Sequence, residues 1–279
     1  MRHASLLLLA SLIPLFCNAS LATGDNGERP AAAVSQASAP KLALIIDDLG
    51  QNPARDARVL ALPGPVALAI LPDTRHASQL SQRAHAAGKT VMLHLPMAPA
   101  GGPYAWRPEL PQDELRRRLD DALAVVPHAS GLNNHMGSQM TDQQQPMAML
   151  MATLQQRHLF FLDSRTNPRT LAAATAQRAG LASLSRDIFL DDDPSPAAVA
   201  RQFAAALALA RKQGSVVIIG HPHRSTLELL ERELPRLGEL GIAWIDIGQM
   251  IATRGNRAMA AHGRGGVYRY VGASAVQRK

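Results

Sequence analysis

Acidic and imidazole side chains recur in this sequence at the ends of short apolar runs. The first such run ends at Asp47 and Asp48, the third contains His94 next to its end, and the fourth contains His135. One carboxylate and two imidazoles, with water in a fourth position, form a catalytic zinc arrangement. Asp48, His94 and His135 are therefore candidate ligands of a divalent metal, with Zn²⁺ the expected ion.

Two further residues are placed to move protons around such a metal. Asp47 and Asp48 are adjacent, and successive side chains of a strand point in different directions, so they do not form a pair sharing one proton. Asp47 is then a candidate base beside the metal, and His221, which follows the run 215–220, is a candidate acid for a leaving group. The only cysteine is Cys17, which excludes a thiolate site in the folded part of the chain.

Strand-length apolar runs alternate with stretches of helical periodicity through most of the chain. The runs cover residues 42–47, 66–71, 90–95, 131–136, 159–163, 183–190, 215–220 and 242–247, and the helical stretches cover 53–62, 76–87, 111–126, 143–157, 168–179, 195–213 and 225–240. This alternation predicts an α/β fold with parallel strands that are buried on both faces. About 210 residues fit a single (β/α) barrel of seven or eight strands, with a doubly wound open sheet as the alternative. The glycine fingerprint of a dinucleotide site does not follow the first run.

A barrel of this kind brings the carboxyl ends of its strands to one rim, where chemistry is usually found. Polar residues follow most of the predicted strands, and their convergence favours a functional site over isolated helix caps. Beyond those already named, the candidates at this rim are Asn134, Asp163, Arg165, Arg186, Asp187 and His223.

The two ends of the chain differ in composition from its centre. Residues 1–22 combine Arg2, an apolar run and small residues near Ala22, which predicts a secretory signal peptide and a periplasmic or secreted protein, with an uncleaved anchor as the alternative. Residues 23–40 have the composition of a disordered linker, and residues 41–251 form the expected folded domain. Residues 252–279 are basic, contain no Asp or Glu, and are expected to be disordered.

The positive charge is concentrated at these ends. The formal net charge is +7, but seven of the 29 basic residues lie in the signal peptide or in the tail, and taking seven from 29 leaves 22 against 22 acidic residues. The folded part is therefore neutral, and no nucleic-acid partner is expected. Contact with a membrane is expected only through an uncleaved signal or the basic tail.

The segments "IIDDLG", "MLHLPM", "NNHMGS", "FLDSRT", "RDIFLD" and "GHPH" occur in this order along residues 41–250. Together they resemble the divergent polysaccharide deacetylase family, a branch of the NodB-homology carbohydrate esterases. The resemblance implies a distorted (β/α) barrel, a divalent metal that is usually zinc, and removal of N- or O-acetyl groups from glycans. The implied partner is an acetylated glycan or a cell-envelope polysaccharide.

The family pattern transfers to this sequence with one departure. It implies Asp47 as the base, Asp48 and His94 as metal ligands, and His221 as the acid. A second histidine is expected four residues after His94, but Ala98 stands there. His135, from a different strand, is the substitute that we expect.

Other residues have two open interpretations each. The arginine that orients the base in the superfamily is Arg165 or Arg186, and Asp163 and Asp187 either hold the site histidines or cap loops and pair with these arginines. His223 is a further ligand or a nearby polar group, and Asn134 is a candidate for supporting the ligands or the substrate. Tyr104 and Trp106, in the loop 97–110, either stack on a sugar face or plug the barrel mouth.

The sequence thus favours a metal-dependent glycan deacetylase of the cell envelope. A catalytically inactive glycan-binding protein on the same barrel is the alternative, motivated by Ala98. A metal-dependent phosphoesterase is less favoured because the predicted rim has few cations for a phosphate dianion.

Overall fold

A computed structural model describes residues 39–261 of the chain. The predicted signal peptide, nearly all of the predicted linker and the tail from residue 262 lie outside the described residues. The strands are β1 (Lys41–Leu49), β2 (Ala67–Ile70), β3 (Thr90–Met97), β4 (Gly131–Met136), β5 (Phe160–Asp163), β6 (Ser183–Ser185), β7 (Ile188–Phe189), β8 (Ser215–Gly220) and β9 (Ala243–Trp244). The helices are α1 (Pro53–Ala61), α2 (Ala77–Ala86), α3 (Gln112–Val125), α4 (Gln144–Gln156), α5 (Ala172–Arg178), α6 (Pro196–Gln213), α7 (Arg224–Glu233), the 3-10 turn η1 (Leu234–Arg236) and α8 (Ile247–Ala261).

Residues with a strong local preference set the ends of several helices. Asn52 caps α1 by accepting hydrogen bonds from the backbone N–H groups of Ala54 and Arg55, and Pro53 occupies the first helical position. Helix α6 also begins at a proline, and it ends at Gly214, whose φ of 79° is costly for other residues. The described residues contain no helix long and apolar enough to cross a membrane.

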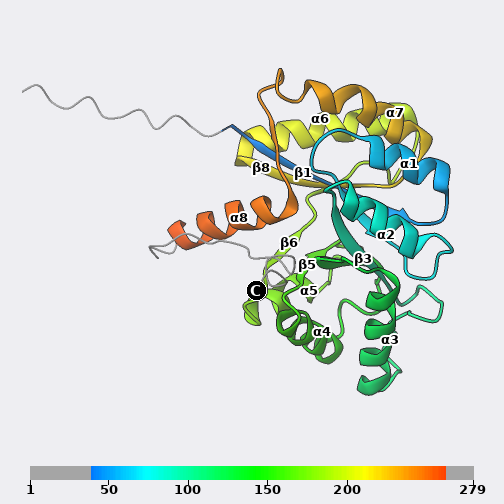
Figure 1. The fold of residues 1–279 in the computed structure, drawn as a ribbon. Coiled ribbons are helices and arrows are strands. Elements are labelled where there is room, and N and C mark those ends of the chain that lie inside the picture. Colours follow the sequence, from blue (N-terminus) through cyan, green and yellow to red (C-terminus); the bar gives the residue numbers. More distant parts are fainter. Residues whose placement is uncertain (1–38, 262–279) are drawn as a thin grey trace, which may run out of the picture. The chain divides into compact units, whose positions relative to one another are not determined.

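All strand pairs are parallel, in the order β6-β5-β4-β3-β2-β1-β8-β7, with β9 beside the start of β1. The sheet curls into the distorted (β/α) barrel that the sequence predicts, with helices on its outer face (Figure 1). An open doubly wound sheet is therefore excluded.

The run 183–190, expected to form one strand, forms two and makes the seam of the barrel. Its first part, β6, pairs with β5, whereas its second part, β7, pairs with β8. Between them, the N–H of Arg186 donates to the carbonyl of Asp163 and the N–H of Asp187 donates to the carbonyl of Val217. The barrel is thus joined here by the covalent chain instead of by a ladder of hydrogen bonds.

The end of the domain differs from the sequence prediction. Strand β9 contains only two residues, and from Ile247 the chain is helical to Ala261. The expectation that residues 252–279 are disordered is therefore wrong for residues 252–261. Ile247, Met250 and Ile251 of α8 pack against Ala43 and other inward residues of the strands, so burial of this apolar face stabilises the helix.

Alternation along the strands separates two apolar clusters. On β1, Leu42 and Leu44 face the helices, whereas Ala43 and Ile45 face the barrel interior. The next inward position on β1 is Asp47. By the same alternation, the next inward residue after Met92 of β3, two positions later, is His94. The next one after Ile219 of β8 is His221. The apolar interior therefore ends in a layer of polar side chains at the carboxyl ends of the strands.

Candidate metal centre

Asp47 lies at the bottom of this polar layer. It is buried, and the side-chain amide of Asn133 donates hydrogen bonds to both of its oxygens, at 2.9 and 3.1 Å. Burial raises the pKa of Asp47 above its ordinary value, whereas His94, His221 and Asn133 oppose this rise. The carboxylate is thus held in one orientation, with Oδ2 3.6 Å from Nε2 of His94.

Asp48 reaches the same layer through an irregular backbone. Simple alternation would direct its side chain toward the helices. However, β1 shifts register against β2 between Ile46 and Leu49, and Asp48 has a left-handed φ of 59°. This bulge turns the carboxylate of Asp48 to the rim beside His94 and His135. A left-handed backbone is unfavourable for most residues but less so for aspartate, and such strain is often found at functional sites.

Asp48, His94 and His135 converge within a small space. Oδ1 of Asp48 lies 2.9 Å from Nδ1 of His135 and 3.2 Å from Nε2 of His94, and the two nitrogens are 3.2 Å apart. Within the described residues no hydrogen bond of regular geometry reaches this buried oxygen, although both nitrogens lie at hydrogen-bonding distance from it. Burial would raise the pKa of Asp48, but the two imidazoles lower it far below its ordinary value.

These three atoms fit a small divalent cation. Ligands about 2.0–2.1 Å from a tetrahedral zinc ion are about 3.3 Å apart, close to the spacing seen here. A cation would satisfy this buried carboxylate oxygen and would bind the lone pairs of the two imidazole nitrogens beside it. The donor set of two nitrogens and one oxygen suits Zn²⁺ and other transition ions better than Mg²⁺ or Ca²⁺.

Asn133 connects the candidate base to one candidate ligand. Its side-chain oxygen lies 2.8 Å from Nδ1 of His94, while its NH₂ group donates to Asp47. Since the amide oxygen can only accept, His94 carries its proton on Nδ1 and turns the lone pair of Nε2 toward Asp48. No role for Asn133 is predicted from the sequence, although its inward position one residue before Asn134 is a signal for one.

Asn134, a candidate from the sequence, faces away from the ligands. Its amide donates to the carbonyl of Met136 and to the hydroxyl of Thr166, and its side-chain oxygen accepts from the N–H of Ser164. Asn134 therefore holds together the loops that follow β4 and β5. Its effect on His135 is indirect, through the backbone of this rim.

His221 forms a pair with a buried carboxylate. Its Nδ1 lies 2.8 Å from Oδ1 of Asp191, while Oδ2 of Asp191 accepts from the N–H of His221 and the hydroxyl of Thr226. Burial would lower the pKa of His221, but the hydrogen bond to Asp191 and the nearby acidic charges raise it to about 9. Asp191 was not assigned a role from sequence, although it directly follows the run 183–190.

Asp191, His221 and His223 form a second group with the residue types of a metal site. Both oxygens of Asp191 are already hydrogen-bonded, unlike the orphaned oxygen of Asp48. We therefore interpret this group as a carboxylate–imidazole pair. His223 precedes α7 as its cap residue and places its ring 5.9 Å from that of His221.

The remaining charged candidates contact neither of these groups through hydrogen bonds. Asp163 accepts hydrogen bonds from the N–H of Arg165 and from the hydroxyl of Thr170. It therefore caps a loop, one of the two interpretations open from the sequence. Asp187, which the sequence predicts at the rim, instead precedes β7 and lies beside the middle of β8. Asp187 accepts from the N–H of Val217 and pairs with Arg254 of α8, so it stabilises the seam. The expectation that these carboxylates hold site histidines is not met.

Of the two arginines considered for orienting the base, neither hydrogen-bonds Asp47. Arg186 donates to the carbonyls of Ser164 and Arg165 and lies over the ring of Phe189 at 3.6 Å. Arg165 is exposed. Asn133 holds the carboxylate of Asp47 in their place.

The two aromatic residues of the loop 97–110 line neither of the two clefts that open beside these groups. Trp106 is fully buried in the apolar cluster between sheet and helices, and Tyr104 packs partly buried against the same cluster. Sugar stacking by Trp106 is thus contradicted, and it does not plug the barrel mouth either. Ala98 is buried, with its N–H donating to the carbonyl of Trp106, so this loop is held by its backbone.

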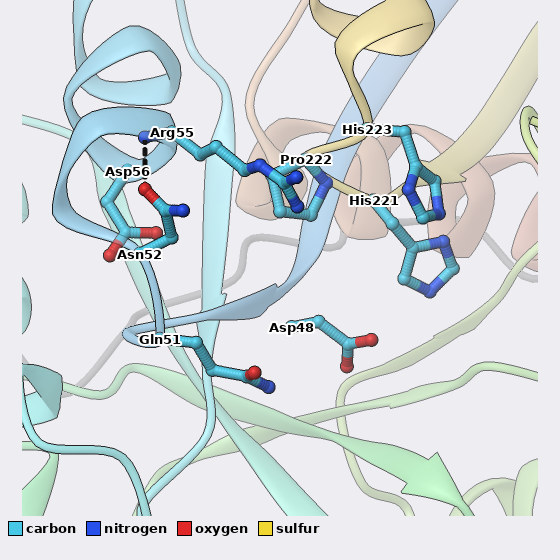
Figure 2. A pocket seen from close by; sticks show the side chains of 8 residues that line it. All are labelled: Asp48, Gln51, Asn52, Arg55, Asp56, His221, Pro222 and His223. Carbon is cyan, nitrogen blue, oxygen red and sulfur yellow. Dashed lines mark hydrogen bonds between the residues drawn. The ribbon is translucent and has the colours of Figure 1, made fainter.

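Two clefts open beside the three converging atoms. One has a volume of about 310 Å³ and includes Asp48, His221 and His223, with Arg55 and Asp56 of α1 (Figure 2). The other has a volume of about 390 Å³ and is lined by His135 together with mainly apolar residues, among them Pro96, Pro99 and Met136. Gln51 lines both clefts.

A family model described as divergent polysaccharide deacetylase matches residues 44–251, which contain all of these side chains. The chain belongs to the divergent polysaccharide deacetylase family. This deacetylase-family chain is 42% identical over 198 residues to the uncharacterized protein YibQ of Escherichia coli (strain K12). The match covers 70% of this chain and 62% of YibQ, so it spans less than two thirds of that relative.

Solved structures support the fold that is expected for a member of this family. The uncharacterized protein ATU2773 of Agrobacterium tumefaciens C58 has a TM-score of 0.73 at 20% identity, over 77% of this chain and 91% of that one. A variant of the peptidoglycan deacetylase PdaC of Bacillus subtilis has a TM-score of 0.50 at 12% identity, over 81% of this chain and 96% of that one. At these identities the likeness shows the NodB-like barrel, and the activity is argued from the site.

Proposed function

We propose that this protein is a metal-dependent deacetylase of cell-envelope glycans, hydrolysing N-acetyl or O-acetyl groups. The observation that carries the proposal is the convergence of Asp48, His94 and His135 around a buried oxygen that lacks a hydrogen bond of regular geometry. Membership of the divergent polysaccharide deacetylase family supports the same chemistry. A single cluster thus combines a metal-binding donor set with a buried carboxylate, Asp47, one residue away.

Asp48, His94 and His135 would hold the divalent ion, which we propose to be Zn²⁺. Such an ion supplies Lewis-acid chemistry, polarising an acetyl carbonyl and increasing the acidity of water. Asn133 fixes the tautomer and direction of His94, so part of the geometry is set before the ion binds.

Asp47 is the proposed base. It must be ionised to take a proton from the attacking water, and burial alone would favour the neutral form. The two hydrogen bonds from Asn133 stabilise the ionised form and aim the carboxylate. A buried carboxylate with a raised pKa is a stronger base than an exposed one, which suits proton removal near neutral pH.

His221 is the proposed acid. With a pKa of about 9 it carries a proton at neutral pH, and Asp191 holds Nδ1 so that Nε2 is the nitrogen free to donate. His221 and Asp48 line the same cleft, so a substrate placed there can meet both. Nε2 of His221 would protonate the departing amine or alkoxide, balancing the proton that Asp47 removes.

We further propose that the protein acts in the periplasm or outside the cell, from the predicted signal peptide at residues 1–22. The proposed partner is an acetylated envelope polysaccharide. A catalytically inactive glycan-binding protein remains the alternative function. However, Ala98 motivated that alternative, and His135 now stands where a second imidazole is needed.

The test is metal content and acetate release from N-acetylated and O-acetylated glycans, using the chain without its predicted signal. One divalent ion per chain, and release that is abolished by Asp47→Asn, would support the proposal. Asp113→Asn, at an exposed position in the first turn of α3, is the matched control and should behave as the unmodified chain. Glycan binding without acetate release in the metal-loaded chain would favour the inactive binding protein. Failure to bind zinc at all would contradict the metal centre.

A further inference from the structure

We infer that the cleft between α1 and residues 221–223 binds a negatively charged group of the substrate, with Arg55 as its principal ligand. The inference rests on the proposed function and narrows the substrate to an acidic acetylated glycan. The chemistry recognised is that of a carboxylate or phosphate on the sugar next to the acetyl group. Three features of the cleft and a comparison with the second cleft support it.

Arg55 is a free cation. Arg55 lies in the first turn of α1, and its backbone N–H donates to the side-chain oxygen of the cap residue Asn52. Its guanidinium has no ion pair or hydrogen bond within residues 39–261. Arg58, one turn later, pairs with Glu231 at 2.8 Å. The planar guanidinium of an unpaired arginine offers two parallel N–H donors, which match a carboxylate or a phosphate.

The carboxylates nearest in the cleft do not neutralise this charge. Asp56 is buried, accepts a hydrogen bond from the N–H of Gly50, and has a pKa raised by burial. Asp48 belongs to the proposed metal centre, where the ion would balance its charge. In Figure 2 the side chain of Arg55 extends toward residues 221–223, whereas the carboxylate of Asp56 points the other way.

The opposite wall of the cleft adds further hydrogen-bond donors. His221 and His223 both line it, and the ring of His223 has no hydrogen-bond partner within the described part of the chain. Arg55 and the two imidazoles therefore line the same cleft, whose volume of about 310 Å³ is within the range of small-ligand sites. An anion between these walls would be attracted from both sides.

The second cleft lacks these features. Its lining is mainly apolar, with His135 as its one imidazole and Asp73 as its one carboxylate. A glycan lying across Gln51 would therefore place its charged substituent on the α1 side and a neutral, less polar part on the other side. This asymmetry gives the substrate a direction across the metal centre.

The experiment uses three tetrasaccharides of N-acetylglucosamine that differ only at C6: the neutral form, a form oxidised to a carboxylate and a form phosphorylated there. Acetate release gives kcat/KM for each with the zinc-loaded chain. Calorimetry gives the affinity for each with the same preparations. Arg116→Gln is the matched control, since Arg116 is exposed on α3 and has no ion pair among residues 39–261.

We expect the chain to prefer a charged tetrasaccharide, with the carboxylate and phosphate arms showing which anion is favoured. Arg55→Gln should reduce the ratio of charged to neutral kcat/KM by about tenfold, the effect of one charge-assisted contact at an open site. Arg55→Lys should keep part of the preference, and Arg116→Gln all of it. Melting curves establish that each variant is folded.

Two results would overturn the inference: no preference for a charged sugar, or the same preference after Arg55→Gln. If none of the three sugars releases acetate, the proposed function fails on these substrates, and the affinities then decide the inference separately. Tighter binding of a charged sugar that is lost in Arg55→Gln would support it. Equal binding of all three sugars would refute it.

Discussion

Replacing Asp191 with asparagine would remove the charge that keeps His221 protonated. Oδ1 of Asp191 lies 2.8 Å from Nδ1 of His221, and the pKa of His221 is about 9 although burial alone would lower it from the ordinary 6.5. In Asp191→Asn only burial and the more distant carboxylates remain. We therefore expect the pKa of His221 in the variant to lie near or below 6.5.

The magnitude follows from this shift. A rise from 6.5 to about 9 is about 2.5 units, or about 3 kcal/mol at about 1.4 kcal/mol per unit. Because the folded pKa is raised, this stabilisation is complete below pH 6.5 and is lost as the pH rises through about 9. The unmodified chain should therefore lose stability over this window, whereas Asp191→Asn, already less stable at neutral pH, should change little.

The assay is an NMR titration of the His221 ring after treatment with a chelator, because a bound cation nearby would itself lower the pKa. Thr226→Val is the matched control, since it removes one hydrogen bond to Asp191 but leaves the charge in place. If the zinc-loaded chain releases acetate as proposed, the alkaline limb of kcat/KM should move to lower pH in Asp191→Asn. A ring that titrates near 6.5 in the unmodified chain, or near 9 in the variant, would refute the reasoning.

Three further changes have defined outcomes. His135→Ala should weaken zinc binding by about 100-fold or more in a competition with a chelator, because a direct ligand is lost, whereas His158→Ala at an exposed position should have no effect. Asn133→Ala removes the hydrogen bonds that lower the pKa of Asp47, so the acidic limb of kcat/KM should move up by about one to two units; an unmoved limb would refute its role. Gly131→Ala would place a methyl group 2.4 Å from the ring of Phe160 and should destabilise the chain by about 1–3 kcal/mol in urea unfolding, while Gly101→Ala, which meets nothing within 4 Å, should be neutral.

The residues that could be placed from sequence are those that follow the regular alternation of a strand. Ile45 is followed two positions later by Asp47, and Ile219 by His221, so a barrel assignment alone brings these groups to one inner rim. The general position of His94 follows in the same way. The placement of these side chains is predictable because the apolar interior fixes which face of each strand is inward.

Irregular backbone and packing account for most of what the sequence did not predict. The left-handed conformation of Asp48 depends on a bulge against β2, which has no local signal beyond the double aspartate itself. The choice between Asn133 and Asn134 depends on register, because a shift of one residue exchanges the two faces. The position of Trp106 in a Gly/Pro-rich loop suggested an exposed ring that could stack on a sugar. However, backbone hydrogen bonds to Pro96 and Ala98 fold this loop back, and the ring is buried.

The pairing of β3 with β4 places His135 where the proposed metal centre needs a second imidazole, in place of Ala98. In the register of these strands His94 lies opposite Asn133 and Pro96 lies opposite His135, so His94 and His135 are diagonal neighbours on the inner face. With neighbouring strands about 4.8 Å apart and two residues spanning about 6.6 Å, these diagonal positions are about 8 Å apart, a gap that two imidazole rings can close. Their nitrogens meet at 3.2 Å, with the rings nearly perpendicular. A cross-strand pair thus supplies the two nitrogen atoms of the proposed metal centre, and Asn133, directly opposite His94, joins His94 to Asp47.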